Sequence, residues 1–300
     1  MTAPRPVFPG QFLTIQRRCT QRQFLLRPDA ETNNAFTYLL AEAAQRFDMD
    51  IILPQMMSNH HHTAVYDRHG NHVELREHFH KLMAKSQNAL RGRWENMWAT
   101  EEPCVVEAVA AEDLLNQLVY IATNPVNDGL VDRVHHWPGP NFVQALLSGR
   151  AMKATRPRHF FREDGPMPEE IELRLGLPDD FPGKEAFLAE LERRIAEVEE
   201  KCGRERMQSG RRVVGRRCIL RQSWRDTPTT LEPRRNLRPR VAARDKQDRI
   251  AALHRNKEWQ AEYRSARLLW LAGFEVEFPH GTYWLRRFAT VRVKPPPEAN

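Results

Sequence analysis

The order of hydrophobic periodicities in residues 11–123 is the feature that most constrains the fold of this chain. Apolar and polar residues alternate as in β-strands, or form short β-branched runs, over 11–16, 50–57, 57–67 and 103–109. Apolar residues recur at three- and four-residue steps, as in helices, over 29–47, 73–90 and 111–123. The order strand, helix, strand, strand, helix, strand, helix predicts an α+β fold. It corresponds to the ferredoxin-like split βαβ plan, with an antiparallel sheet and one added helix.

Two prolines indicate where these elements are irregular. Pro54 cannot donate a backbone hydrogen bond, so the strand that contains it is expected at a sheet edge or with a bulge. Pro125 is expected to end the helix that begins at Ala111.

Three consecutive histidines lie in the strand that forms a hairpin with 50–57. Because strand side chains alternate between faces, His60 and His62 point the same way and His61 points to the other face. Two imidazoles spaced in this way can chelate one divalent metal ion. The alternative from these residues alone is a chance cluster on a half-exposed strand. A histidine at position 61 must be hydrogen-bonded or partly exposed.

Charge is distributed unevenly along the 300 residues. Residues 204–300 hold 23 Lys and Arg against 10 Asp and Glu, a net charge of +13, whereas the whole chain carries +7, so residues 1–203 sum to −6. We therefore predict a first domain at 1–138, a proline-rich connection at 139–182 and a basic, largely helical extension at 183–300.

A one-signed basic region interleaved with tryptophans favours contact with a polyanion such as DNA. The alternatives are a solvated charged face and tryptophans that belong to the core. The candidate DNA-contacting residues are Arg17, Arg18, Arg91, Arg93, Trp94, Arg216, Arg217, Arg234, Arg235 and Arg238.

No apolar segment of the chain has the length of a signal peptide or a membrane span. The four cysteines are widely separated and include no C-x-x-C pair, which favours free thiols in a reducing compartment. We therefore expect a cytoplasmic protein with no membrane partner.

Two motifs in this order resemble those of the single-tyrosine HUH transposases, in particular the REP-associated tyrosine transposases. The first is Met57-Ser58-Asn59-His60-His61-His62, and the second is Tyr120-Ile121-Ala122-Thr123-Asn124-Pro125-Val126 followed by Gly129-Leu130-Val131. The resemblance spans about residues 10–150. Ser58 and His61 depart from the family's proline and apolar residue at these positions, and His61 leaves open which histidines bind metal.

The resemblance implies a role for each matching residue. His60 and His62 would be the metal-binding pair, Asn124 the third ligand and Tyr120 the nucleophile. The metal would be Mg²⁺ or Mn²⁺. The implied reaction is cleavage and rejoining of single-stranded or hairpin DNA through a 5′-phosphotyrosine intermediate, in the cytoplasm at the nucleoid.

Two other functions stay open from the sequence. One is a non-catalytic DNA- or RNA-binding protein that keeps the fold, and the other is an HUH replication or relaxation nickase. The sequence also leaves open whether the active unit is a monomer or a homodimer.

Overall fold

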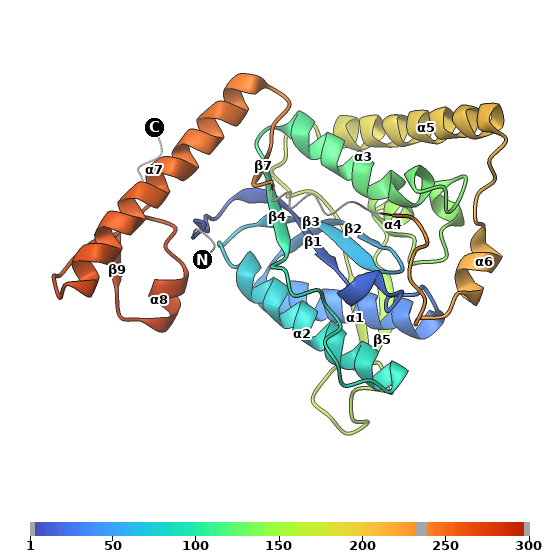
Figure 1. Ribbon diagram of the computed structural model, residues 1–300, viewed down its shortest axis with the longest axis horizontal. Coiled ribbons are helices and arrows are strands. Elements are labelled where there is room, and N and C mark those ends of the chain that lie inside the picture. Colours follow the sequence, from blue (N-terminus) through green and yellow to red (C-terminus); the bar gives the residue numbers. More distant parts are fainter. Residues whose placement is uncertain (1–3, 232–238, 297–300) are drawn as a thin grey trace.

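A five-stranded sheet forms the centre of the molecule in a computed structural model that describes residues 4–231 and 239–296. Its strands, in spatial order, are β2 (Asp50–Met56), β3 (His60–Asp67), β1 (Gln11–Arg18), β4 (Cys104–Ala108) and β7 (Val241–Ala242). The first four strands pair antiparallel, whereas β7 pairs parallel to β4 (Figure 1). The fold is therefore mixed α/β with a mainly antiparallel sheet, as the pattern predicted.

Helices cover both faces of this sheet. On one face, α1 (Ala30–Phe47) and α2 (His72–Arg91) bury Phe36 and Phe79, whose rings pack edge-to-face with centroids 5.2 Å apart. On the other face lies α3 (Ala111–Asn127), as Figure 1 shows. Asp29 caps α1 by accepting a hydrogen bond from the Thr32 backbone N–H, so the helix begins where the sequence indicated.

The two prolines behave differently from one another. Strand β2 is an edge strand, and its pairing with β3 shifts register between Ile51 and Leu53, so the prediction for Pro54 is confirmed. The prediction for Pro125 is wrong, because α3 continues through it to Asn127. The carbonyl of Pro125 accepts from the Leu130 backbone N–H, which closes the last turn. This extra turn places Asn124 within regular helix.

The proline-rich connection contains regular structure that its sequence pattern did not predict. It holds α4 (Phe142–Ser148) and a hairpin of β5 (Met152–Thr155) and β6 (Glu170–Leu173), along with the 3₁₀ turn η2 (Val134–His136) just before it. A second 3₁₀ turn, η1 (Thr20–Arg22), follows β1. The hairpin lies against α1, since Asn34 donates to the Thr155 carbonyl at 2.7 Å and the Tyr38 hydroxyl to the Pro168 carbonyl at 2.6 Å.

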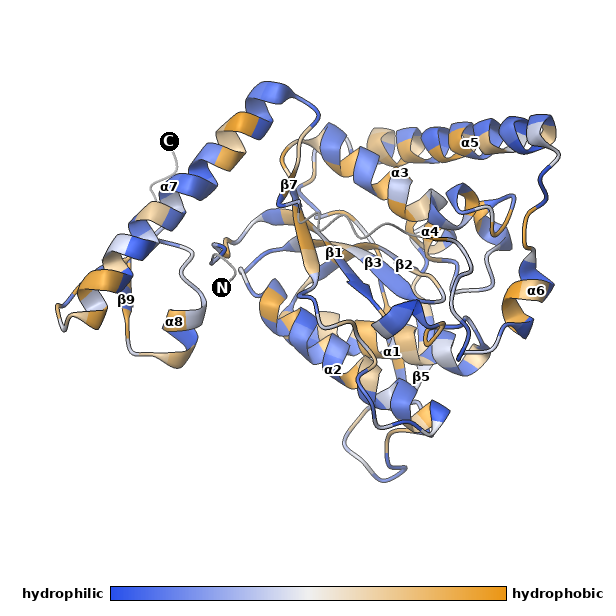
Figure 2. Ribbon diagram, viewed as in Figure 1, coloured by the Kyte–Doolittle hydropathy of each residue, from blue (hydrophilic) through white to orange (hydrophobic). Residues whose placement is uncertain are grey.

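The long helix α5 (Lys184–Ser209) packs beside α3 and joins the central core through Leu191 and Ile195. It is followed by α6 (Arg216–Arg221), α7 (Lys246–Leu271), β8 (Glu277–Phe278), α8 (Trp284–Phe288) and β9 (Arg292–Val293). Both α5 and α7 alternate hydrophilic and hydrophobic stretches along their lengths (Figure 2). The central core extends as far as Ile219, whereas α7 packs Trp259 against Tyr263 with ring centroids 5.2 Å apart.

Among the described helices, none is both long and apolar enough to cross a membrane.

Candidate functional site

Strand β3 places His60 and His62 on the sheet face beneath α3. Their rings are perpendicular, with centroids 5.0 Å apart, and His62 is only 2% exposed. The Nδ1 atom of His60 lies 2.7 Å from Asn59 Oδ1. An amide oxygen only accepts, so Nδ1 carries the proton and the lone pair of Nε2 is available to a ligand.

Helix α3 brings Tyr120 and Asn124 over the same histidines. One helical turn separates the two residues, so their side chains lie on neighbouring parts of one helix face. The Tyr120 ring is perpendicular to the His62 ring, with centroids 5.5 Å apart, and is 50% exposed. Asn124 is 5% exposed. The structure therefore brings together the four residues that the two sequence motifs singled out.

Two buried polar atoms at this site have no hydrogen-bond partner among the described residues: His62 Nε2 and Asn124 Oδ1. Burying an unpaired acceptor costs about 1–3 kcal/mol of free energy, and a cation bound to these two atoms would offset that cost. Both atoms carry a lone pair that can coordinate a divalent cation. Among the described residues, no three His, Cys, Asp or Glu side chains lie close enough together to hold a metal ion. A metal bound here would therefore need the Asn124 amide as its third ligand.

Both histidines are neutral at physiological pH. Burial lowers the pKa of His60 to about 4, with the positive charges of Arg18 and Arg22 acting in the same direction and the Asn124 side chain acting against them. Burial also lowers the pKa of His62 well below its usual range, helped by the neighbouring His60 and His61. Because a metal binds only the neutral imidazole, the site needs no deprotonation before binding.

His61 points to the opposite face of the sheet, as its place in the strand predicted. Its Nδ1 lies 3.0 Å from the Thr63 hydroxyl and its Nε2 lies 2.9 Å from His80 Nε2, while Phe36 and Phe79 pack around it. The histidine that departs from the family motif is therefore fully hydrogen-bonded in the core between the sheet and α1 and α2.

The two arginines at the end of β1 lie on different faces. Arg18 pairs with His60 in register and shares its face, whereas Arg17 pairs with His61. The Arg17 guanidinium lies 3.1 Å from His80 Nδ1 and 5.5 Å from the Trp98 ring centre, and burial lowers its pKa. Of the two, Arg18 is the one placed to meet a ligand at the histidine site.

Residues 91–98, at the end of α2 and just after it, combine arginines with tryptophans, and these side chains differ in how far they are exposed. Arg91 donates to Asp29 at 2.6 Å and to Thr32, so it supports the start of α1. Arg93 donates to Gln23 at 2.9 Å, and Trp94 is 92% exposed. Trp94 is thus the member that faces solvent.

The candidate arginines of the C-terminal third lie on α6 or outside the described residues. Arg216 and Arg217 are exposed at the start of α6. The backbone N–H groups of Val214 and Gly215 donate to the carbonyls of Gly129 and Leu130, which places α6 beside the loop that follows α3. Arg234, Arg235 and Arg238 lie outside the described residues.

Sequence reasoning missed the neighbours of His62 within the sheet. Gln16 and Gln55 both pair with His62 in register, so their side chains share its face. Gln16 could have been found from the sequence, because it lies two residues before Arg18 on the same strand and so on the same face. Gln55 could not, because its pairing with His62 depends on the bulge in β2.

Comparison with solved structures finds a likeness to a transposase bound to DNA. Neither a protein-family model nor a curated protein matches the chain. The solved structure of a REP-associated tyrosine transposase bound to a REP hairpin aligns with 16% identity, 50% of this chain, 87% of that chain and a TM-score of 0.42. A likeness of this extent carries no argument about function, so the functional inference depends on the side chains described above.

Proposed function

We propose that this protein is a metal-dependent enzyme that cleaves and rejoins single-stranded or hairpin DNA, of the single-tyrosine HUH transposase class. One observation carries the proposal: two buried, unpartnered metal-donor atoms lie beneath a half-exposed tyrosine. The strand order β2-β3-β1-β4 supports a ferredoxin-like HUH domain as its framework.

The residues at the site fit a divalent cation. His60, His62 and Asn124 would hold Mg²⁺ or Mn²⁺ through two neutral imidazoles and one amide oxygen. When bound, the ion would offset negative charge on the oxygens of a phosphodiester. Arg18, on the same face as His60, would add positive charge for the DNA backbone.

Tyr120 would act as the nucleophile. Its oxygen forms a bond to phosphorus while the bond from phosphorus to the 3′ oxygen breaks, which leaves a 5′-phosphotyrosine and a free 3′ hydroxyl. The tyrosine proton passes to water, since the side chain is half-exposed, and the leaving 3′ oxygen takes up a proton. Attack by another 3′ hydroxyl on the phosphotyrosine reverses these bonds and joins the strands without an external energy source.

The test is adduct formation with labelled single-stranded and hairpin DNA in Mn²⁺, resolved by denaturing electrophoresis. We expect a DNA-linked protein band that is lost in Tyr120→Phe and in His60→Ala. Tyr66→Phe and His69→Ala are the matched controls and should keep the band. Tyr66 lies near the other end of β3, and His69 lies in the turn after β3, where it pairs with Asp48.

The outcomes separate this proposal from its alternatives. Retention of the adduct in Tyr120→Phe would refute the assigned nucleophile. DNA binding without any adduct would leave a non-catalytic binding protein. An adduct that never joins to a new 3′ end would indicate a nickase.

A further inference from the structure

Tyr120 borders a pocket that the proposed chemistry does not use. The pocket has a volume of about 280 Å³ and lies between α3 and α5, with Val119, Tyr120 and Val198 among its walls. Ligand pockets have volumes of roughly 300–1,000 Å³, so this one is near the lower limit and suits a single nucleotide unit rather than a length of strand.

Polar groups in the pocket are held in fixed orientations. Asn127 donates from Nδ2 to the Thr123 hydroxyl at 2.9 Å and its Oδ1 accepts from the Cys202 thiol at 3.5 Å, which leaves one lone pair of Oδ1 for a ligand. Asn116 Oδ1 accepts from Arg194 at 3.2 Å and its Nδ2 donates to Glu112 at 3.4 Å, which leaves its second N–H for a ligand. The two amides therefore offer one acceptor and one donor at set positions, which is what hydrogen-bonded reading of a base edge requires.

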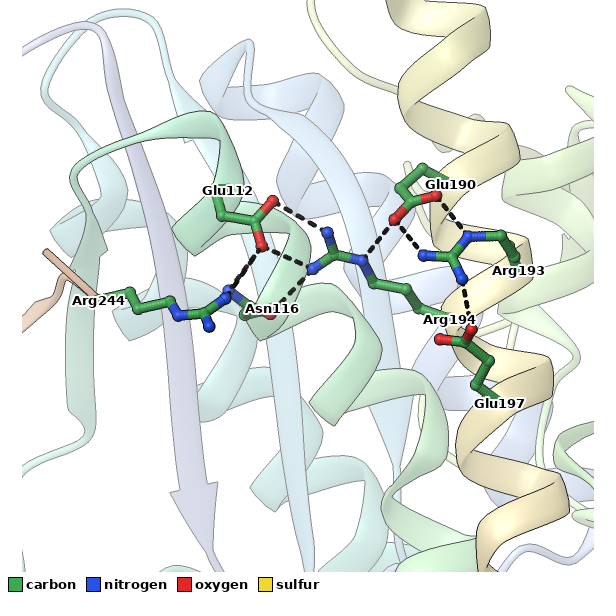
Figure 3. Close-up of polar contacts among 7 residues, drawn as sticks. All are labelled: Glu112, Asn116, Glu190, Arg193, Arg194, Glu197 and Arg244. Carbon is green, nitrogen blue, oxygen red and sulfur yellow. Dashed lines mark hydrogen bonds and ion pairs between the residues drawn. The ribbon is translucent and has the colours of Figure 1, made fainter.

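The two walls of the pocket are held together by an ion-pair network at one end (Figure 3). Arg194 of α5 donates to both carboxylate oxygens of Glu112 on α3, at 2.7 and 3.1 Å, and also to Glu190 at 2.7 Å. Arg244, which follows β7, approaches Glu112 at 3.8 Å. These contacts join α3 and α5 near Asn116, which also lines the pocket.

Charged side chains of α5 lie at the pocket. Lys201 and Glu205 both line it, and their charged groups are 4.0 Å apart on the exposed side of the helix. An ammonium group in this place can meet the phosphate that follows a bound nucleotide.

We propose that this pocket holds the base of the nucleotide whose 5′ phosphate becomes linked to Tyr120, and that α5 thereby sets which base follows the cut. The inference rests on the proposed function, because that chemistry attaches this nucleotide to the tyrosine at the pocket wall. Val119, Val198 and the Tyr120 ring give the base apolar contact, and the Asn116 and Asn127 amides read its edge.

The first experiment identifies the linked nucleotide and removes its base. DNA with randomised positions is incubated with the full chain and Mn²⁺, and the DNA that remains attached after proteolysis is sequenced. The preferred oligonucleotide is then compared with one that has an abasic site at the first linked nucleotide. Loss of the base should slow adduct formation roughly ten-fold, since contacts of one base contribute about 1–3 kcal/mol.

The second experiment fills the pocket. In Val198→Trp the intact oligonucleotide should react about ten-fold more slowly than in the wild type, and an abasic site should have no further effect, because the base contact is already lost. Ala196→Trp places the same ring elsewhere on α5 and should behave like the wild type. An equal effect of the abasic site in Val198→Trp and wild type would overturn the proposal.

A third variant, which leaves the pocket open, tests the proposal even if Val198→Trp does not fold. Lys201→Ala should slow adduct formation several-fold and make it less sensitive to salt, whereas Arg204→Ala, an exposed cation of α5 outside the pocket, should not. Equal effects of the two substitutions would contradict a role for the pocket.

A binding measurement separates this inference from the proposed function. Deoxynucleoside 5′-monophosphates at millimolar concentration should shift the side-chain amide resonances of Asn116 and Asn127 in wild type but not in Val198→Trp. Such shifts without any DNA adduct would support the pocket and refute the enzyme. Adducts that form at the same rate whatever the first linked base would refute the pocket and support the enzyme.

Discussion

At the scale of single residues, the proposed metal site depends on the Asn124 oxygen, which has no hydrogen-bond partner among the described residues. Asn124→Ala should lower the affinity for Mn²⁺ at least ten-fold or so, since even outer-sphere partners of metal ligands contribute roughly 10–100-fold. Its metal-free stability near pH 7 should change less than its metal affinity, because no described residue donates to Oδ1 while His60 is neutral and carries its proton on Nδ1.

The measurement is thermal unfolding across a Mn²⁺ titration. Wild-type melting temperature should rise with metal concentration, and that of Asn124→Ala should rise far less. Asn127→Ala, one turn further along α3, is the control and should respond like wild type. A metal response in Asn124→Ala equal to that of wild type would remove Asn124 from the ligand set.

The buried histidines on the other face make stability depend on pH. Burial lowers the pKa of His61 to about 3, and burial together with the positive charges around it lowers that of His80 well below its usual range. The unfolded chain therefore binds protons below about pH 6.5 while the folded chain does not, so stability falls as the pH decreases. From pH 7 to 5, His61 alone should remove about 2 kcal/mol from the free energy of unfolding.

Urea unfolding at pH 7 and pH 5, in the presence of a chelator, measures this change. The interval lies above the range in which Asp29 and Asp67, whose pKa values are lowered, take up protons. A free energy of unfolding that is constant over this interval would show that the buried histidines are not held neutral.

At the scale of elements, the stability of α3, which carries Tyr120, depends on its contact with α5. Arg194→Met removes the bidentate pair with Glu112 and the contact with Asn116, and should lower the free energy of unfolding by about 1 kcal/mol. Arg193 is the matched control, because its ion-pair partners among the described residues are Glu190 and Glu197, which lie on α5 itself (Figure 3).

Hydrogen exchange locates the effect. In Arg194→Met, protection of the first turns of α3 should decrease, while Arg193→Met should leave it unchanged. Equal destabilisation by the two substitutions would mean that the bridge between helices adds nothing beyond pairing within α5.

At the scale of the whole molecule, the charge asymmetry should appear in the salt dependence of DNA binding. Arg216 and Arg217 are exposed next to the loop that follows α3. If both neutralise phosphates of single-stranded DNA, replacing them with Gln should reduce the slope of log affinity against log salt by about 1.4.

Lys153 and Arg174, on the β5–β6 hairpin and just after it, are the control pair for this experiment. Their replacement with Gln removes the same charge from another part of the surface and should leave the slope unchanged. A slope that changes equally in both double variants would indicate a general effect of net charge.

The sequence alone determined the strands and helices between residues 11 and 123, apart from the short turn η1, and the sheet face of His60, His61 and His62. Local physics decides both, because strand side chains alternate and helices begin at caps such as Asp29. It also singled out Tyr120 and Asn124, which lie one turn apart on one helix.

Tertiary structure decided which polar atoms are left unpaired and which helices meet. Three features depend on residues far apart in the chain: the absence of a described partner for Asn124 Oδ1, the register of Gln55 beside His62, and the position of α5 across the pocket from Tyr120. The continuation of α3 through Pro125 likewise depends on the return of Leu130 to its last turn. The hydrophobic periodicity of a sequence indicates which face of a helix or strand is buried. The residues that this face contacts are determined by how separate elements pack together.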